Sequence, residues 1–179
     1  MLLLLLALVG MNPGFATAQT QTSREYQLKA VFLFNFAQFT HWPTNAFTNG
    51  ESPIVIGVLG IDPFGDVLEE TVRDETVNGR KLVIERYRRL EEIQSCHILF
   101  ISQSETRRLD RILESLRGKP VLTVGDIDPA FGQHLAIRFL PENNRLRIRI
   151  NIDSVSDAGL TISSKLLRAA EIIPPGKAP

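Results

Sequence analysis

The sequence predicts an α/β fold: a single-domain, three-layer sandwich with a mainly parallel sheet and an antiparallel hairpin near the carboxyl end. Apolar runs such as residues 55–59 show no polar alternation, which is typical of strands covered on both faces. Helix-start and helix-stop signals alternate with these runs along the chain. This rhythm of strand, helix and strand requires crossover connections, which make the sheet mainly parallel.

The first 18 residues have the pattern of a secretory signal peptide. An apolar stretch covers residues 2–9, and Ala16-Thr17-Ala18 supplies the small residues of a cleavage site. A membrane-spanning helix needs about 18 or more apolar residues, and Asn12 and Pro13 interrupt this run. We therefore expect an exported protein that is cleaved near Ala18 and whose mature chain does not insert into a membrane.

The rest of the chain has the size of one domain, which we assign to residues 19–173, followed by a flexible tail at 174–179. The 20 Lys and Arg residues balance 20 Asp and Glu residues, so the net charge gives no reason to expect nucleic-acid binding. Cys96 is the single cysteine and cannot form an intrachain disulfide. We expect it to be a buried, unreactive thiol.

The first helix is predicted to begin at a capping box, Thr22-Ser23-Arg24-Glu25, and to stop at Trp42-Pro43. Apolar residues lie at helical spacing along it: Leu28, Val31, Phe32, Phe36 and Phe39. Its second side is also apolar apart from Asn35, so the helix should be sandwiched between layers or shared with a partner. A buried Asn35 needs hydrogen-bond partners, and it serves either as a structural pin or as part of a pocket.

The central part of the sequence alternates strands and helices. After the strand at 55–59, Asp62 is predicted as the N-cap and Pro63 as the first residue of a helix that ends near Val72. Asn78-Gly79 marks a tight turn before an alternating strand at 81–86. A short helix at 90–93 and a central strand at 97–101 follow.

The carboxyl-terminal part begins with a strongly marked helix. Ser102 and Glu105 form its predicted capping box, and Gly118 stands just past its end. A strand at 120–124 follows, and then a hairpin, 135–140 with 145–150, is expected at a sheet edge. Helices at 153–158 and 163–172 complete the predicted elements.

Several polar residues follow strands that end at the same side of the predicted sheet. Open parallel sheets bind ligands at this carboxyl edge. The edge therefore forms a candidate rim for a small ligand, made of Asp62, Phe64, Gly65, Ser102 and Asp126.

We expect no catalytic, cofactor or metal site. The three histidines, His41, His97 and His134, are scattered, and adjacent strand residues such as Cys96 and His97 point to opposite faces. Ser163-Ser164-Lys165 has the residue types of a serine and lysine nucleophile pair, but helix capping is the favoured interpretation.

Basic side chains alternate along the second strand of the predicted hairpin. Arg145, Arg147 and Arg149 share one face, joined by Arg138 across the hairpin. This face binds an acidic partner or a phosphate, or it is a solvated surface that guards the sheet edge, and the latter is the simpler interpretation.

Six motifs, in order, resemble the YfiR-like family, a family of exported bacterial proteins. They span approximately residues 26–173 and are Leu28-Lys29-Ala30-Val31-Phe32-Leu33-Phe34-Asn35-Phe36-Ala37 with Trp42-Pro43; Ile56-Gly57-Val58-Leu59-Gly60 with Asp62-Pro63-Phe64-Gly65; Val77-Asn78-Gly79-Arg80; Cys96-His97-Ile98-Leu99-Phe100-Ile101; Val121-Leu122-Thr123-Val124-Gly125-Asp126; and Ile162-Ser163-Ser164-Lys165-Leu166-Leu167.

The resemblance implies a non-catalytic regulator that represses the periplasmic part of an inner-membrane diguanylate cyclase and is itself titrated by an outer-membrane lipoprotein. Its output is then the level of cyclic di-GMP and biofilm formation. The pattern departs from redox-sensitive members, because Cys96 alone provides no cysteine pair for disulfide control.

The aromatic-rich first helix could offer the apolar interface that such a regulator needs, either to the cyclase or to a second copy of the chain. The candidate partner surface consists of Phe32, Asn35, Phe36, Phe39 and Trp42. The alternative function is a periplasmic module that senses a small ligand at the carboxyl rim.

Overall fold

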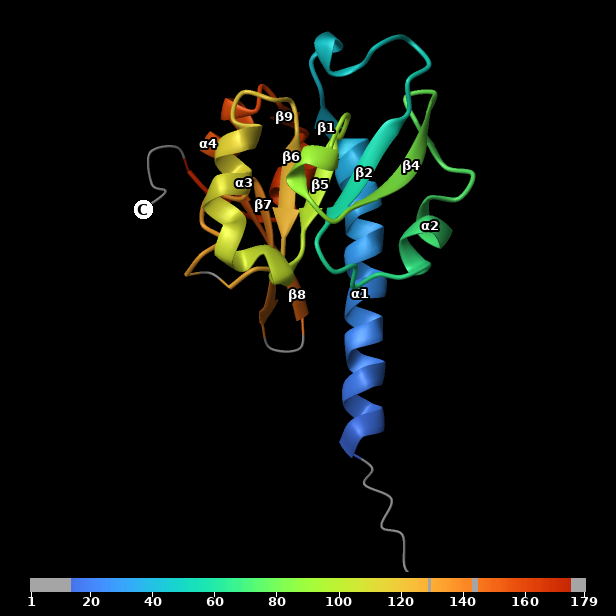
Figure 1. Cartoon of the computed structure of the whole chain (residues 1–179), viewed down its shortest axis with the longest axis vertical. Coiled ribbons are helices and arrows are strands. Elements are labelled where there is room, and N and C mark those ends of the chain that lie inside the picture. Colours follow the sequence, from blue (N-terminus) through green and yellow to red (C-terminus); the bar gives the residue numbers. More distant parts are fainter. Residues whose placement is uncertain (1–13, 129, 143–144, 175–179) are drawn as a thin grey trace, which may run out of the picture.

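An eight-stranded sheet between two layers of helices forms the centre of the computed structural model (Figure 1). The structure describes residues 14–128, 130–142 and 145–174, and only the backbone of residues 14–23. The strands of this sheet are β2 (Ile54–Leu59), β3 (Thr76–Val77), β4 (Arg80–Tyr87), β5 (Ile98–Ile101), β6 (Leu122–Gly125), β7 (Ile137–Glu142), β8 (Arg145–Asn151) and β10 (Glu171–Ile173).

The strand order is β10-β8-β7-β6-β5-β2-β4-β3. The pairs β7–β8 and β3–β4 are antiparallel and the other pairs are parallel. The mainly parallel sheet and its carboxyl-terminal hairpin confirm the predicted fold class. Two further short strands, β1 (Thr40–His41) and β9 (Thr161–Ile162), pair antiparallel outside this sheet.

Helices cover both faces of the sheet. On one face, α1 (Gly14–Phe39), α2 (Val67–Val72), α4 (Ile152–Asp157) and α5 (Ser164–Arg168) contribute to one hydrophobic core. On the other face, α3 (Leu109–Leu116) packs over a second core. Three 3-10 turns complete the chain: η1 (Thr44–Ala46), η2 (Leu90–Glu92) and η3 (Gln103–Arg108). All six residues of β2 are buried, as the apolar run of its sequence predicts.

Helix α1 begins earlier than predicted, at Gly14, so the capping box at 22–25 is wrong. No Gly or Pro occurs between residues 15 and 42, so nothing in this stretch stops the helix from extending toward the amino terminus. Glu25 instead forms an ion pair with Lys29, with 2.6 Å between Oε1 and Nζ. The signal peptide stays a prediction, because residues 1–13 lie outside the described residues. Within the described part of the chain, no helix has the length and apolar character needed to span a membrane.

The helix after β2 is shorter than predicted. Asp62 does not cap it, because α2 begins only at Val67 and Asp66 occupies its N-cap position. The Asp62 Oδ1 atom instead accepts a hydrogen bond of 2.7 Å from the Phe64 amide in the turn that precedes the helix. Gly65 has a positive φ of 56°, which breaks the helical path after Pro63, and α2 starts only at Val67. The helix predicted from Ser102 is likewise divided. Ser102 caps the 3-10 turn η3 and α3 follows it.

The predicted final helix at 163–172 is wrong in its second half. Helix α5 ends at Arg168, and β10 then pairs parallel with β8. Arg149 Nη2 on β8 lies 2.8 Å from Glu171 Oε1, and Ile172 lies opposite Ile150, so pairing with the sheet outweighs continuation of the helix. The hairpin is therefore not the sheet edge, because β10 covers β8.

The close contact at Gly57 on β2 generates a test of the packing. A Cβ atom at this position would lie 2.6 Å from Tyr87 Cε2 and 2.9 Å from Cys96 Sγ. We expect Gly57→Ala to lower the free energy of unfolding by about 1–3 kcal/mol, measured by urea denaturation. Gly50→Ala is the matched control, because no described residue other than Gly50 and its two chain neighbours has an atom within 4 Å of the place that its Cβ atom would take. It should change stability by less than about 0.5 kcal/mol.

Candidate functional site

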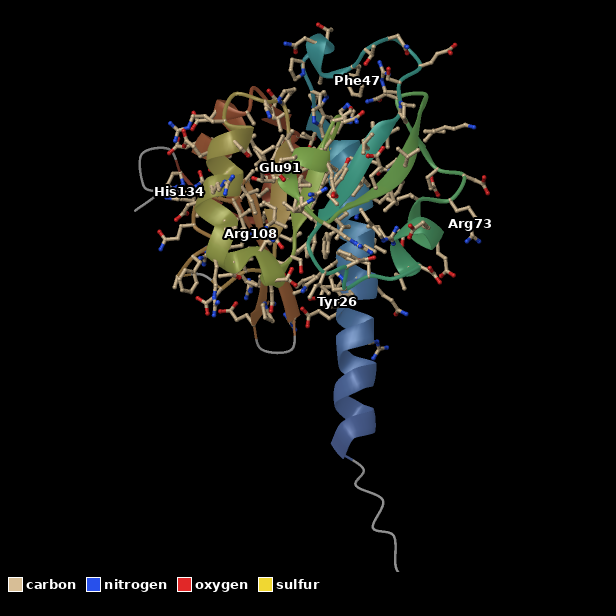
Figure 2. The ribbon with its side chains drawn as sticks, viewed as in Figure 1. Tyr26, Phe47, Arg73, Glu91, Arg108 and His134 are labelled. Carbon is tan, nitrogen blue, oxygen red and sulfur yellow. The ribbon has the colours of Figure 1, made fainter. Side chains whose placement is uncertain are left out.

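The predicted rim residues do gather at the carboxyl edge of the sheet. Asp62, Ser102 and Asp126 each follow the end of a neighbouring strand, namely β2, β5 and β6. Helix α1 passes this edge and extends beyond it toward its amino terminus, and Tyr26 lies where the helix leaves the sheet (Figures 1 and 2). Helix α1 therefore covers the part of the rim formed by Asp126 and Phe64, whereas Gly65 is exposed.

A buried ion pair joins α1 to the rim. Lys29 Nζ lies 2.5 Å from Asp126 Oδ2, and the two side chains are only 1% and 2% exposed. Tyr26 donates a hydrogen bond of 2.8 Å to the same oxygen, and its ring lies 4.2 Å from the Lys29 ammonium. We call Glu25, Tyr26, Lys29 and Asp126 the anchor cluster.

The electrostatics of the anchor cluster keep the Tyr26 hydroxyl protonated. Burial, and next the charge of Asp126, raise the pKa of Tyr26. Tyr26 therefore remains a neutral hydrogen-bond donor at physiological pH. The Asp126 Oδ1 atom is buried without a hydrogen-bond partner among the described residues, which shows that the carboxylate is held mainly by Lys29 and Tyr26.

The other rim residues also have protein partners. Asp62 Oδ2 accepts a hydrogen bond of 2.7 Å from Arg86 Nε, and the Gly65 carbonyl accepts one of 2.8 Å from Arg86 Nη2. The ring of Phe64 packs edge-on against Tyr26 and Phe100, with centroid distances of 5.3 Å and 4.8 Å. These protein contacts use the residues that were proposed to bind a ligand. Ligand binding at this rim stays a prediction.

A hollow of about 300 Å³ lies elsewhere, between α3 and α4. Its lining includes Leu113, Val121 and Thr123, and three carboxylates, Asp110, Glu114 and Asp157. A second hollow of about 210 Å³ shares Asp110 and His134 with the first, and Figure 2 shows His134 beside α3. We call the two together the α3 groove. Sequence reasoning missed it, because no motif links residues so far apart in the chain.

The predicted partner surface lies largely on the inner face of α1. Phe36 is fully buried, and its ring stacks on Phe139 with centroids 5.7 Å apart, so it does not belong to an exposed surface. Phe32 and Phe39 are half-buried against the same core, and Trp42 is half-buried after the helix. The aromatic residues of α1 therefore indicate the side of the helix that packs on the core, not a partner surface.

The exposed side of α1 carries different residues, Leu28, Val31, Asn35 and Gln38, which we call the outer stripe. Leu28 is 44% exposed and Val31 is 45% exposed, although both are large and apolar. Asn35 is half-buried, and its side chain has no hydrogen-bond partner among residues 14–128, 130–142 and 145–174. Of the predicted surface, Asn35 alone lies on this stripe.

The other residues considered from the sequence have structural surroundings. Burial raises the pKa of the Cys96 thiol to about 12. The side chain of Ser163 accepts a hydrogen bond from the Lys165 amide, as expected of a cap. Arg147 pairs with Glu142, and Arg149 pairs with Glu171. The described residues include no group of three or more His, Cys, Asp or Glu side chains placed to hold a metal ion.

The anchor cluster generates a stability prediction. Lys29→Met leaves the Asp126 carboxylate buried without a counter-charge, so we expect the free energy of unfolding to fall by about 3–5 kcal/mol in urea denaturation. Lys29→Met with Asp126→Asn should recover part of this loss. Arg117→Ala breaks an exposed ion pair, with both side chains at least 65% exposed, and should have an effect below about 1 kcal/mol. Equal effects of Lys29→Met and Arg117→Ala would contradict the assignment.

Two comparisons with known proteins bear on this arrangement. No curated protein matches the chain significantly. A family model described as YfiR/HmsC-like matches residues 26–171, which is well over half of the chain. The matched region begins at Tyr26 of the anchor cluster and ends at Glu171, the first residue of β10, so it covers the other seven strands of the sheet and both cores. The chain belongs to the YfiR/HmsC-like family.

Proposed function

We propose that this protein is a non-catalytic periplasmic regulator that binds and represses the periplasmic part of an inner-membrane diguanylate cyclase. Repression lowers cyclic di-GMP and biofilm formation, and an outer-membrane lipoprotein relieves it. Family membership supports the signalling role. The outer stripe of α1 is the observation that supports docking onto another polypeptide.

The outer stripe has the properties of a protein-binding surface. Leu28 and Val31 present apolar side chains on a helix that the anchor cluster holds against the sheet. A rigid helix loses little conformational freedom on binding, so burial of these side chains contributes directly to affinity. A second copy of the chain is the other occupant that this surface could accept.

Repression requires no bond-making step. A regulator that binds the inactive conformation of the cyclase more tightly than the active one shifts the population toward the inactive state. A shift from almost fully active to almost fully inactive needs about 5.5 kcal/mol of differential affinity. An interface centred on apolar helix residues can supply free energy of this size.

Charged substitutions on the outer stripe test the docking surface. We expect Leu28→Glu and Val31→Glu each to weaken binding to the cyclase periplasmic domain by about 30-fold. Each substitution removes an apolar side chain whose burial in the interface contributes roughly 2 kcal/mol to the binding free energy. Isothermal titration calorimetry measures the affinity. Phe131→Glu is the matched control, because Phe131 is also a large apolar residue and is 59% exposed.

The outcomes separate the occupants of the stripe. Loss of cyclase binding in the α1 variants, with normal binding by Phe131→Glu, supports the proposal. Unchanged cyclase affinity together with loss of self-association in sedimentation experiments assigns the stripe to a homodimer. A gene deletion that leaves cyclic di-GMP unchanged contradicts the regulatory role.

A small-ligand sensor is the second candidate function, and the α3 groove is the observation that favours it. Asp110 and Asp157 have no ion-pair partner among the described residues, so the groove favours small organic amines.

An amine at 100 times its dissociation constant should stabilise the protein by about 2.7 kcal/mol in thermal unfolding. The Asp157→Asn variant should lose most of this gain. A screen of amines, sugars and nucleotides without a stabilising compound argues against a sensor.

A further inference from the structure

His97 lies in a buried position between two backbone groups that require its neutral form. The side chain is 2% exposed. Its Nδ1 atom accepts a hydrogen bond of 3.0 Å from the Val55 amide, and its Nε2 atom lies 3.1 Å from the Ala46 carbonyl, to which it donates. This pattern uses one ring nitrogen as an acceptor and the other as a donor, which only neutral imidazole provides.

His97 connects the sheet to residues 42–53, which we call the 42–53 segment. Phe47 of this segment stacks on the His97 ring, with centroids 4.5 Å apart and planes 20° apart. Trp42 packs edge-on against the same ring, and its Nε1 atom donates to the His97 carbonyl at 3.3 Å. Figure 2 shows Phe47 at the end of the sheet opposite Tyr26, so this contact is separate from the anchor cluster.

Arg80 on β4 covers the outer side of the stack. Its guanidinium carbon lies 3.9 Å from the centroid of the Phe47 ring. The Nη1 atom of Arg80 also donates hydrogen bonds to the carbonyls of Asn49 and Ser52, at 3.0 Å and 2.6 Å. His97 and Arg80 therefore hold the 42–53 segment from two sides.

The groups around His97 determine what protonation would do. β2 contributes the Val55 amide, a donor, and β4 contributes the Arg80 guanidinium, a positive charge one ring away. Cys96, which precedes β5, belongs to the core on the opposite face of the sheet. Imidazolium would place a donor against the Val55 donor and a second positive charge near Arg80, without a nearby carboxylate among these contacts.

We propose that His97 is an acid-operated latch, which keeps the 42–53 segment closed while neutral and releases it when protonated. Protonation of His97 should affect the 42–53 segment locally, because the contacts of His97 join this segment to one end of the sheet. The anchor cluster lies at the other end (Figure 2). Release changes the surroundings of Trp42 and the surface that the segment presents. The inference is independent of the proposed cyclase interface.

The direction of the pH response follows from the same contacts. Burial, opposed in part by the hydrogen bond to Ala46, lowers the pKa of His97 below its ordinary value of 6.5. The open state, with a solvated ring, therefore binds more protons than the closed state between this lowered pKa and about 6.5. The closed state is favoured above pH 6.5 and is lost as the pH falls through the lowered pKa.

The chain provides a direct probe of this opening. Trp42 is the single tryptophan, so the emission of the full chain reports on the stack that contains His97. We expect a reversible change in emission with a midpoint below pH 6.5, under conditions where far-ultraviolet circular dichroism is constant. His97→Gln should abolish it, because the glutamine amide keeps one acceptor and one donor but does not titrate.

The other two histidines supply matched controls. His41→Gln and His134→Gln should retain the full emission change. The Val55 amide proton of the unmodified protein gives a second measurement, which does not depend on a variant that folds. Its resonance should shift upfield in the same pH range as its hydrogen bond to His97 is lost.

Three results overturn the proposal. The first is an emission change that persists in His97→Gln. The second is a Val55 resonance that does not move while Trp42 emission changes. The third is a transition that coincides with loss of circular dichroism, which reports acid unfolding of the whole domain.

Discussion

The ion pair between Lys29 and Asp126 is the interaction on which the arrangement of this protein depends. It joins the amino-terminal helix to the carboxyl edge of β6, across 97 residues of sequence, and both side chains are removed from water. Burial of two charges is favourable only where their geometry is good and additional hydrogen bonds support it. Tyr26 and Glu25 supply that support. Helix α1 is thereby fixed in rotation, which determines the face that it presents to solvent.

This rotation explains why the sequence predicted the position of α1 but not its exposed face. The helix is apolar nearly all round, so hydrophobic spacing alone does not distinguish the core face from the outer face. The aromatic residues turn inward, where Phe36 stacks on Phe139, and the smaller Leu28 and Val31 turn outward. Lys29 was the available signal, since a single cation within an apolar run needs a specific partner.

The strands were predictable for a related reason. A strand buried on both faces needs consecutive apolar residues, and β2 and β5 have them. The structure of residues 171–173 was not predictable from local sequence. These residues leave the helical path to pair with β8, and the pairing brings Glu171 to Arg149. Such pairing is a tertiary interaction that local sequence does not encode. The α3 groove is of the same kind, because separate elements form it.

Together, these features describe a rigid sheet with the anchor cluster at one end, the buried His97 contact at the other, and the outer stripe exposed along α1 (Figure 2). Family membership connects this arrangement to signalling, and the outer stripe connects it to a partner. Hydroxyl-radical footprinting of the complex with the cyclase periplasmic domain tests this account most directly. The account predicts that labelling of Leu28 and Val31 falls on binding while labelling of Phe131 is unchanged. Unchanged labelling of Leu28 and Val31 in a formed complex would contradict it.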